Sequence, residues 1–244
     1  MNQLVEHESR LARFPLLRDA APAALAEAAR RARWCRAQPG EVVVDYGDVS
    51  DDVFLILAGS VRVALRTPAG QELIVGEREA GEVFGEMAAI DGETRSANVT
   101  ALHTAQLCIL PGPVFLHLVL QSPPVAHRLM RMLTARLRLE DTRLMEMVAL
   151  PVRYRLYSEL LRMARPREDG ALRVSPPPPQ HVIAARIGAR REAVSRELTA
   201  MSRQGLAVVT RQSIALPKPE ALRAAIAATL AGDAPEEGRT RRAG

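Results

Sequence analysis

The spacing of apolar residues changes at Pro111 and Pro113, and this change constrains the fold more than any other feature of the chain. Before the prolines, apolar residues such as Val61, Val63 and Leu65 alternate with other residues, and glycines recur between the alternating runs. Alternation is typical of strands with one buried face. After the prolines, apolar residues recur three and four positions apart, which is typical of helices. The chain is therefore predicted to be an α+β protein with a strand-rich part before a helical part.

Short strands are predicted throughout residues 40–110. The runs that carry this prediction lie at residues 42–44, 53–57, 61–65, 97–101 and 107–109. Because Gly59-Ser60 separates the second run from the third, these two strands are expected to form a tight hairpin. A small antiparallel structure of this kind closes as a barrel or a roll. A short helix is expected before it, from Ala23 to Trp34, and is ended by Pro39-Gly40.

A long helix is predicted from Val125 to Ala149, where Leu150-Pro151 interrupts it. Its apolar positions are Leu129, Met132, Leu133, Leu137, Leu144, Met145 and Val148. This stripe is longer than one small domain needs, so a second copy of the helix along a two-fold axis is expected to cover it. The alternative is a helix that packs only on its own β-roll.

A helix-turn-helix is predicted over residues 180–198. Ile183 and Ile187 share one face of the first helix, Gly188 permits the turn, and Val194 and Leu198 share one face of the second helix. Two runs at residues 206–210 and 213–216 predict a β-hairpin wing. Before this motif, a helix over residues 152–164 and a proline-rich surface loop over residues 165–179 are expected.

The domain boundaries follow from these patterns. We expect a β-roll at 15–124, a dimerisation helix at 125–149, a winged helix-turn-helix domain at 150–220 and a disordered tail at 232–244. A hinge is expected near Leu150.

Charge and cysteine content restrict the partners and the compartment. The 33 Lys and Arg residues exceed the 28 Asp and Glu residues, which favours an anionic partner. Cys35 and Cys108 lie far apart and form no metal-binding pattern, as expected in a reducing cytoplasm. The first ten residues lack the features of a signal peptide, and no segment is apolar enough for a membrane helix. A cytoplasmic protein without a membrane partner is predicted.

Polar residues near the start of the second helix of the motif have the chemistry of base readers. These residues are Arg190, Arg191, Glu192, Ser195 and Arg196. Arginine offers two parallel donors that match guanine O6 and N7, and a glutamate accepts from cytosine N4. The alternative is a solvated helix face with ordinary Arg–Glu pairs.

The pattern Arg191-Glu192 followed by Arg196 resembles the recognition helix of the CRP/FNR family of bacterial regulators. The resemblance implies a homodimer that binds palindromic DNA with TGTGA-like half-sites and acts with RNA polymerase. It implies that Arg191 reads guanine, that Glu192 reads cytosine and that Arg196 supports a guanine contact. Arg190 stands where the cyclic-AMP-binding members usually have a small hydroxyl residue, so different flanking phosphate contacts are expected.

The segment Phe84-Gly85-Glu86-Met87-Ala88, followed by Arg95-Ser96-Ala97, resembles the phosphate-binding cassette of cyclic-nucleotide-binding domains. Arg95 would pair with the cyclic phosphate, and Ser96 would donate a further hydrogen bond. Gly85 would let the backbone N–H groups of a short helix approach the phosphate. Glu86 would accept the ribose 2′-hydroxyl. The alternative is an Arg–Glu ion pair in a β-roll that no longer binds a ligand.

Two acidic residues on the long helix distinguish this chain from the cyclic-AMP-binding members of the family. An ungapped overlay of residues 115–155 places Glu140 and Asp141 where those members contact adenine through Thr and Ser. Carboxylates accept hydrogen bonds, and guanine presents two adjacent donors where adenine presents one amino group. Cyclic GMP is therefore an expected effector beside cyclic AMP. Alternatively, both carboxylates face solvent, and Thr142 or a partner-subunit residue meets the base.

No other cofactor is expected. Iron–sulfur clusters need cysteines close together, and haem needs axial ligands that the scattered histidines do not suggest. The P-loop, esterase and zinc-protease motifs are missing from the sequence, so no enzyme is predicted. The predicted function is a DNA-binding transcription regulator whose DNA affinity is controlled by cyclic AMP or cyclic GMP. The alternatives are a member that binds DNA constitutively or responds to another effector, and an enzyme or nucleotide-sensing adaptor.

Overall fold

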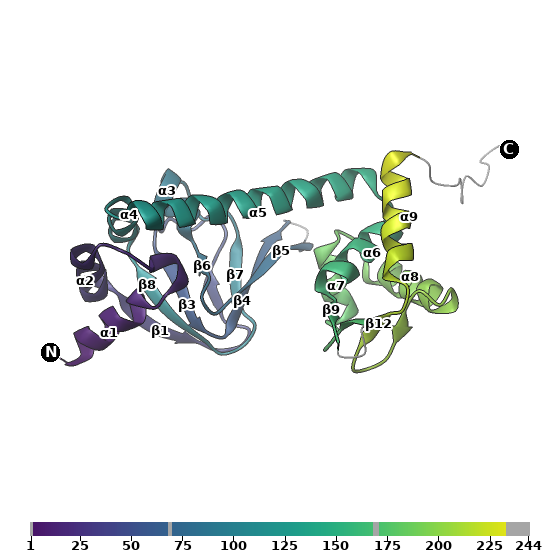
Figure 1. Ribbon diagram of the computed structural model, residues 1–244, viewed down its shortest axis with the longest axis horizontal. Helices are drawn as coiled ribbons and strands as arrows, with labels where there is room; N and C mark the ends of the chain where they lie inside the picture. Colours follow the sequence, from purple (N-terminus) through teal and green to yellow (C-terminus); the bar gives the residue numbers. More distant parts are fainter. Residues whose placement is uncertain (1, 68–69, 168–170, 233–244) are drawn as a thin grey trace. The chain divides into compact units, whose positions relative to one another are not determined.

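The computed structural model describes residues 2–67, 70–167 and 171–232. It divides into two compact units, Met1–Glu140 and Asp141–Gly244. The boundary falls within α5 (Pro123–Ala149), which is one continuous helix (Figure 1). Apart from Gly232, which follows the last helix, the predicted tail lies outside the described residues.

The first unit contains two four-stranded antiparallel sheets, as the alternating sequence predicts. One has the strand order β1-β8-β3-β6 and the other the order β2-β7-β4-β5. The strands are β1 (Arg33–Ala37), β2 (Val42–Val44), β3 (Val53–Ala58), β4 (Ser60–Arg66), β5 (Glu72–Glu79), β6 (Val83–Phe84), β7 (Asn98–Ala101) and β8 (Ala105–Leu110). Buried apolar side chains from both sheets, among them Ile56 and Val61, form one core, so the sheets make a closed β-roll.

The predicted hairpin between residues 53–57 and 61–65 is wrong. Strand β3 pairs with β6 and β8, whereas β4 pairs with β5 and β7, so the chain passes from one sheet to the other between them. Gly59 makes this passage with φ of +82°, and a Cβ there would lie 2.2 Å from the carbonyl oxygen of Thr104. Two alternating runs around a glycine therefore mark a change of sheet here.

The predicted helix from Ala23 to Trp34 ends too late. Helix α2 is Pro22–Arg31, and Trp34 lies in β1 opposite Cys108 of β8. The alanine-rich run favours a helix, but the pairing of β1 with β8 decides the structure of the residues that follow it.

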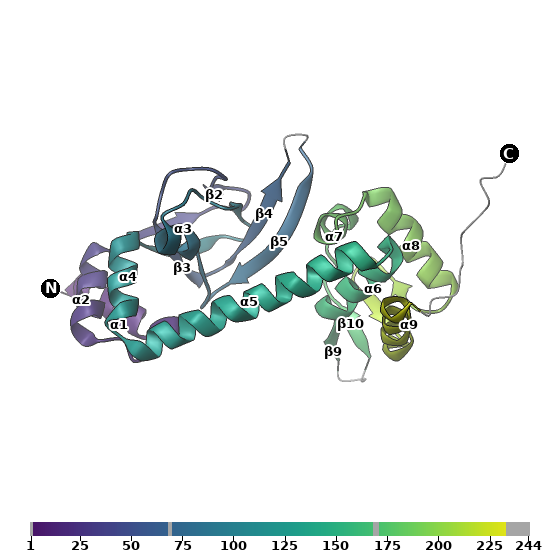
Figure 2. The ribbon, with the colours of Figure 1, turned by 90° about the horizontal axis from the view of Figure 1, so that it is seen from above.

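Helices cover one side of the roll (Figure 2). Beside α2 and α5 they are α1 (Asn2–Ala12), the 3-10 helix η1 (Pro15–Leu17), α3 (Glu86–Asp91) and α4 (Gly112–Leu120). Their buried faces share a core with β3 and β8, in which Leu11, Phe115 and Leu118 are fully buried. Val125 and Leu129, in the first turns of α5, belong to this core and fix that end of the long helix on the roll.

The second unit is a winged helix-turn-helix. Its elements after α5 are α6 (Val152–Met163), β9 (Arg165–Pro166), β10 (Leu172–Val174), α7 (Gln180–Arg186), α8 (Arg191–Arg203), β11 (Val208–Val209), β12 (Ile214–Leu216) and α9 (Pro219–Ala231). Strands β11 and β12 form the predicted wing, and the sheet has the order β11-β12-β10-β9. The expected loop at 165–179 is partly wrong, because β9 and β10 lie within it and β10 pairs with β12.

None of the helices in the described part of the chain has the length and apolarity needed to cross a lipid bilayer.

Candidate ligand pocket and nucleic-acid interface

A pocket of about 280 Å³ lies in the first unit, between strands of the β2-β7-β4-β5 sheet, helix α3 and helix α5. Apolar side chains, including Val63, Leu65 and Val75, line part of its wall. The structure brings five of the six predicted ligand residues to this pocket. They are Gly85, Glu86, Arg95, Ser96 and Glu140. A concave, largely apolar site with a few convergent polar groups is the usual form of a small-molecule site.

Arg95 is held rigidly at the pocket, with only 3% of its surface exposed. Its Nη2 donates to Ser50 Oγ and to the Asp52 carbonyl, each at 2.7 Å, and its Nη1 donates to the Gly85 carbonyl at 3.0 Å. The guanidinium carbon lies 5.7 Å from the centre of the Phe54 ring. Burial lowers the pKa of Arg95, and nearby aspartates oppose the shift. An arginine stays protonated in proteins, so the pocket keeps a fixed, oriented positive charge.

Gly85 lets the cassette backbone approach Arg95. The residue has φ of +80° and ψ of 4°, in the left-handed region, and precedes the first turn of α3. A Cβ would lie 2.8 Å from the Asp52 carbonyl oxygen and 2.9 Å from Nη1 of Arg95. Both the conformation and the close approach therefore require glycine.

Glu86 is buried in the pocket and joins it to the long helix. Its Oε1 accepts a hydrogen bond at 2.7 Å from Nη1 of Arg136, a residue of α5. Nη2 of the same guanidinium donates to the Val83 carbonyl, also at 2.7 Å. A carboxylate has room for further donors beside this one, so Glu86 can meet a ligand hydroxyl and Arg136 together.

The remaining predicted ligand residues lie at the edge of the pocket or beyond it. Ser96 is exposed, and its hydroxyl donates to Met87 Sδ at 3.7 Å. Glu140 lines the pocket from α5 and is half-buried. Asp141 and Thr142 are exposed and do not line the pocket of their own chain. Of the two neighbouring carboxylates, Glu140 therefore lines the pocket and Asp141 does not.

Two arginines that were not among the predicted ligand residues also line the pocket, Arg78 on β5 and Arg136 on α5. Arg136 lies four residues before Glu140, so a helix that turns one toward the pocket also turns the other. Arg78 lies two residues after Gly76 and therefore on the same face of β5. The spacing from Glu140 could have identified Arg136, whereas no predicted site residue lies on β5 to identify Arg78.

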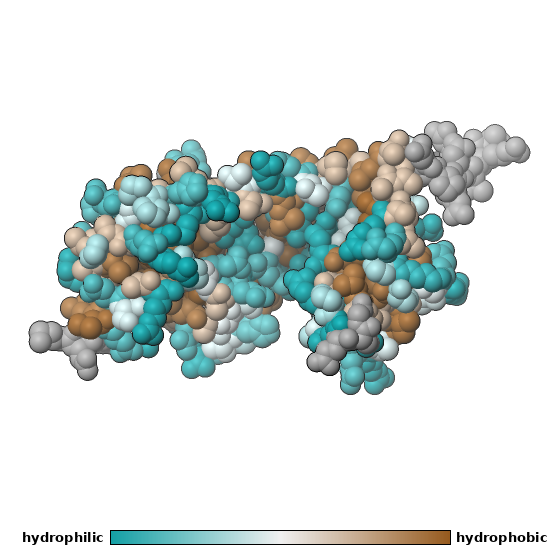
Figure 3. All heavy atoms as spheres, viewed as in Figure 1, coloured by the Kyte–Doolittle hydropathy of each residue, from teal (hydrophilic) through white to brown (hydrophobic). Residues whose placement is uncertain are grey.

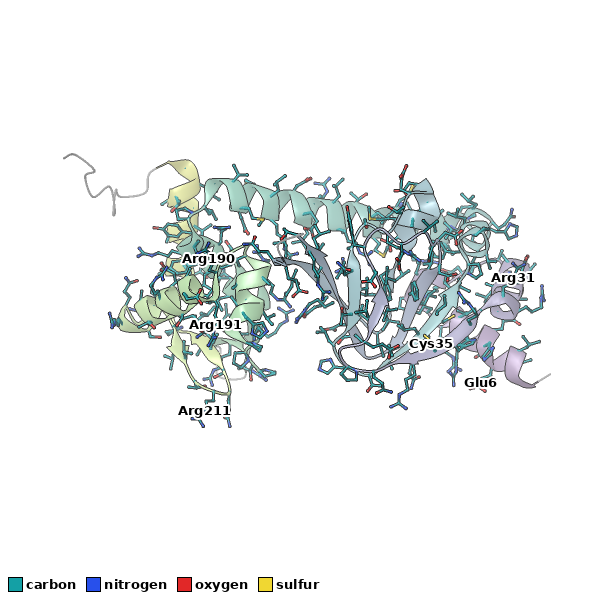
Figure 4. All side chains as sticks on the ribbon, turned by 180° about the vertical axis from the view of Figure 1, so that it is seen from behind. Glu6, Arg31, Cys35, Arg190, Arg191 and Arg211 are labelled. Atoms are coloured by element: carbon teal, nitrogen blue, oxygen red, sulfur yellow. The ribbon has the colours of Figure 1, made fainter. Side chains whose placement is uncertain are left out.

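The candidate nucleic-acid interface lies on α8, beside α7. Val194, Leu198 and Met201 are buried against the other helices of the unit. The predicted DNA-binding residues lie off that buried stripe. Arg190, Arg191, Glu192 and Arg196 are exposed, and Ser195 is half-buried. Figure 4 shows Arg190 and Arg191 at the start of α8, and Arg211 at the turn between β11 and β12.

Arginines of α6 hold the helix-turn-helix in shape. Nε of Arg153 donates to Glu197 of α8 at 3.1 Å, and Nη1 of Arg155 donates to the Ile187 carbonyl at 2.7 Å. Ile187 follows the last turn of α7, where carbonyl groups lack helical partners. The turn itself contains Gly188, with φ of +58°. The exposed face of α8 is therefore presented on a fixed support.

An apolar stripe on α5 is exposed in the single chain. Its exposed members are Met130, Leu137, Leu139, Leu144, Met145 and Val148. Figure 3 shows apolar residues recurring among polar ones along this helix. Such a stripe on a long helix is typical of a surface that another helix covers.

Among the described residues, no group of three or more His, Cys, Asp or Glu side chains is arranged to hold a metal ion.

Comparisons with known proteins agree with this division of the chain. Residues 34–122 match the cyclic nucleotide-binding domain family, and residues 154–225 match the Crp-like helix-turn-helix domain family. A CRP-like cAMP-activated global transcriptional regulator of Mycobacterium tuberculosis is 26% identical over 215 residues, which cover 87% of this chain and 96% of the relative. The cyclic AMP receptor protein of Thermus thermophilus is 32% identical over 167 residues, which cover 68% of this chain and 76% of the relative.

Solved structures share the fold at lower identity. The crystal structure of a putative crp/fnr-family transcriptional regulator from Eubacterium rectale has a TM-score of 0.68 and is 18% identical. The similarity covers 86% of this chain and 98% of that structure.

Proposed function

Because the chain belongs to the CRP/FNR family of transcription regulators, we propose that a cyclic nucleotide in the β-roll pocket controls how tightly its winged helix-turn-helix binds DNA. The observation that carries this proposal is the pocket itself. It combines an oriented guanidinium on Arg95 with a carboxylate on Glu86 that is hydrogen-bonded to α5. Helix α5 is the element that continues into the DNA-binding unit.

The ligand is held by three kinds of contact. Arg95 supplies positive charge and donors for the cyclic phosphate, and Ser96 lies beside it at the pocket edge. Glu86 accepts the ribose 2′-hydroxyl while it stays paired with Arg136. Glu140 meets the base from α5, and Asp141 faces a partner subunit or solvent. The effector is cyclic AMP, as the names of two relatives suggest for those proteins, or cyclic GMP.

The DNA contacts are made by the residues around the start of α8 that lie off its buried stripe. Arg191 reads guanine, Glu192 reads cytosine and Arg196 supports a guanine contact, while Arg190 and Ser195 contact the neighbouring backbone. Two copies of α8 in a homodimer would lie about 34 Å apart and match a palindrome of TGTGA-like half-sites. The exposed apolar stripe of α5 supports such a dimer. RNA polymerase is the expected further partner, and the cytoplasm the expected compartment.

Control requires that the ligand bind one arrangement of the dimer more tightly than the other. A ligand hydroxyl on Glu86 shares that carboxylate with Arg136, so ligand binding changes the contact that fixes α5 to the cassette.

The domain limits that we propose are 15–124, 125–149 and 150–220, with the hinge near Leu150. Helix α9 continues beyond residue 220 and packs in the core of the second unit through Leu222.

One observation favours a second candidate, a regulator that binds DNA without a ligand. The polar groups of the pocket already have partners within the chain. Ser50, Asp52 and Gly85 accept from Arg95, and Arg136 donates to Glu86. These contacts could complete the cassette in the absence of an effector.

Calorimetric titration of the full chain with cyclic AMP and with cyclic GMP separates the two candidates. We expect at least one nucleotide to bind, and Arg95→Lys to weaken binding because lysine keeps the charge but lacks the parallel donors. Glu86→Gln is a second variant that tests the ribose contact without enlarging the side chain. If neither nucleotide binds the unaltered protein, the second candidate replaces the first.

A further inference from the structure

Arg78 is an arginine of the pocket whose contacts within the chain are incomplete. It lies on β5 and lines the same pocket as Arg136 and Glu140. Its Nη1 donates to the carbonyl of the preceding residue, Glu77, at 3.0 Å. Its Nε is buried, and the described residues provide no acceptor for it. Buried donors without partners are rare and costly, so this one calls for a physical explanation.

The absence of a side chain at Gly76 leaves room for the guanidinium of Arg78. Gly76, two residues earlier on the same face of β5, is buried in the interior of the strand. A Cβ at Gly76 would lie only 2.6 Å from Nη1 of Arg78. Glycine inside a strand often marks a close approach of another group, and here that group is the arginine.

The local electrostatics oppose this placement. Burial lowers the pKa of Arg78, and the like charge of Arg136 lowers it further, while Glu82, Glu86 and Glu140 oppose the shift. The guanidinium thus stays at the pocket wall although an exposed position would solvate it better. An acceptor supplied by a ligand would remove this cost.

Arg78 and Arg95 lie toward different parts of the pocket. The charged neighbours of Arg95 are three aspartates, at positions 48, 51 and 52, and Glu86. The charges that act most on Arg78 are those of Arg136, Glu82, Glu86 and Glu140, so Glu86 acts on both guanidinium groups. If Arg95 holds the phosphate and Glu86 the ribose, the nucleobase extends toward Arg78 and Glu140.

The edge of a purine decides whether these donors are satisfied. Guanine presents two adjacent acceptors, O6 and N7, which match the parallel donors of a guanidinium. Adenine presents an amino donor in place of O6, so one donor of Arg78 would face another donor. Glu140 also lines the pocket, its charge acts on Arg78, and its carboxylate offers acceptors for the amino and imino donors of guanine.

We propose that Arg78 is a specificity-determining residue of the pocket, which selects a cyclic nucleotide whose purine carries an oxygen at position six over cyclic AMP. This inference rests on the proposed function, because it needs a cyclic nucleotide bound through Arg95. In this proposal Arg78 donates to the O6 and N7 edge of the base, and Glu140 accepts from its amino and imino groups.

The test is a calorimetric comparison of cyclic GMP, cyclic IMP and cyclic AMP on the full chain. Cyclic IMP keeps O6, N7 and the N1 imino donor but lacks the two-amino group, so it preserves the contacts of Arg78 and removes one of the two donors that Glu140 would accept. We expect the unaltered protein to bind cyclic GMP and cyclic IMP more tightly than cyclic AMP. Arg78→Met should weaken both oxygen-bearing nucleotides by roughly 5- to 150-fold and change cyclic AMP binding little.

Two further variants make the comparison specific. Arg78→Lys keeps the positive charge but lacks the parallel donors. It should therefore retain part of the preference for cyclic GMP and cyclic IMP over cyclic AMP that Arg78→Met loses. Arg62→Met is the matched control, because Arg62 lies on the neighbouring strand β4, pairs with Glu77 at 2.8 Å and does not line the pocket. It should leave all three affinities unchanged.

The binding measurements distinguish a failure of the role proposed for Arg78 from a failure of the proposed function. Equal or tighter binding of cyclic AMP by the unaltered protein would overturn the role of Arg78 and leave the proposed function intact. An equal loss for all three nucleotides in Arg78→Met would also overturn it, since the arginine would then act on the phosphate or on the fold. Binding of none of the nucleotides by the unaltered protein would overturn both proposals.

Discussion

At the residue scale, the backbone conformation of the cassette restricts which residues it can hold. Gly85 and Gly92 stand at the two ends of α3 and both adopt the left-handed conformation. Only Gly85 also lies against other groups, since no atom lies within 4 Å of a Cβ built at Gly92. A side chain at Gly92 would strain only the backbone, whereas one at Gly85 would also contact neighbouring atoms. Comparing substitutions at the two positions therefore distinguishes these two effects on stability.

Gly85→Ala is expected to lower the free energy of unfolding by about 1–3 kcal/mol, because it adds a contact at 2.8 Å to the Asp52 carbonyl and strains the backbone. Gly92→Ala, the control, carries only the left-handed penalty of about 1 kcal/mol. Urea unfolding of both variants measures the difference. Equal losses would show that the cassette tolerates a side chain at residue 85.

The two cysteines should differ in reactivity. Burial, with a smaller contribution from Cys35, raises the pKa of the Cys108 thiol to about 12. Cys35 is exposed, although partial burial and Glu41 raise its pKa as well. Since the thiolate is the reactive form, a disulfide reagent should modify Cys35 faster as the pH rises, and Cys108 only after unfolding. Cys35→Ser should abolish the reaction of the native protein; rapid labelling of that variant would contradict the assignment.

At the scale of elements, the sequence predicts those that are amphipathic over many residues. Helix α5 and the α7–α8 motif were predicted because their apolar positions recur on one face and Gly188 marks the turn. The pairing of β3 and β4 was not, because alternation around Gly59 is the same in a hairpin and in a crossing between sheets. The short strand β10 depends on pairing with β12, and β9 on pairing with β10, which no local pattern encodes.

The candidate site was predicted to a similar extent. Local motifs identified Gly85, Glu86 and Arg95, which lie together in the pocket. Arg78 was missed because only the tertiary fold brings β5 to the cassette, whereas Arg136 could have been found from its place four residues before Glu140 on the same helix.

A buried ion-pair network joins three helices of the second unit. Glu159 of α6, which is 1% exposed, accepts from Arg162 at 3.0 Å and pairs with Arg186 of α7 at 3.4 Å. Arg162 also donates at 2.8 Å to Glu146, near the end of α5. Glu159 therefore stabilises the position of the first helix of the DNA-binding motif.

Glu159→Gln should lower the free energy of unfolding of this unit by about 1.5–3 kcal/mol, because two partly buried guanidinium groups lose a charged acceptor. The control is Glu220→Gln, which removes the exposed pair with Arg223 and should change stability by less than about 0.5 kcal/mol. Thermal unfolding measures both. A Glu159 variant as stable as the control would mean that the network contributes nothing.

The start of α8 can be tested by its effect on base preference. Arg191→Ala should cost about 1–3 kcal/mol of binding free energy on a TGTGA palindrome and relax the preference at one base position. Arg211→Ala, at the wing turn, should weaken binding to all sequences alike and reduce the salt dependence, as expected for a phosphate contact. Selection from a randomised half-site measures both effects. An unchanged preference in the Arg191 variant would place base reading on another element.

At the scale of the whole molecule, the pocket and helix α8 belong to different units that share α5. Glu86 contacts that helix through Arg136 in the first unit, and Glu146 contacts α6 through Arg162 in the second. Helix α5 is therefore held by an Arg–Glu pair near its middle in the first unit and by another near its C-terminal end in the second unit. A ligand can act on DNA affinity through this helix only as far as it binds the DNA-competent dimer more tightly.

This coupling is measured most directly by fluorescence anisotropy on a labelled TGTGA palindrome, with the full chain at one fixed salt concentration. We expect saturating cyclic nucleotide to lower the Kd for DNA by about 5- to 150-fold, and Arg95→Lys to reduce this effect at the same nucleotide concentration. The same Kd with and without cyclic AMP and cyclic GMP would contradict control of DNA binding from the pocket.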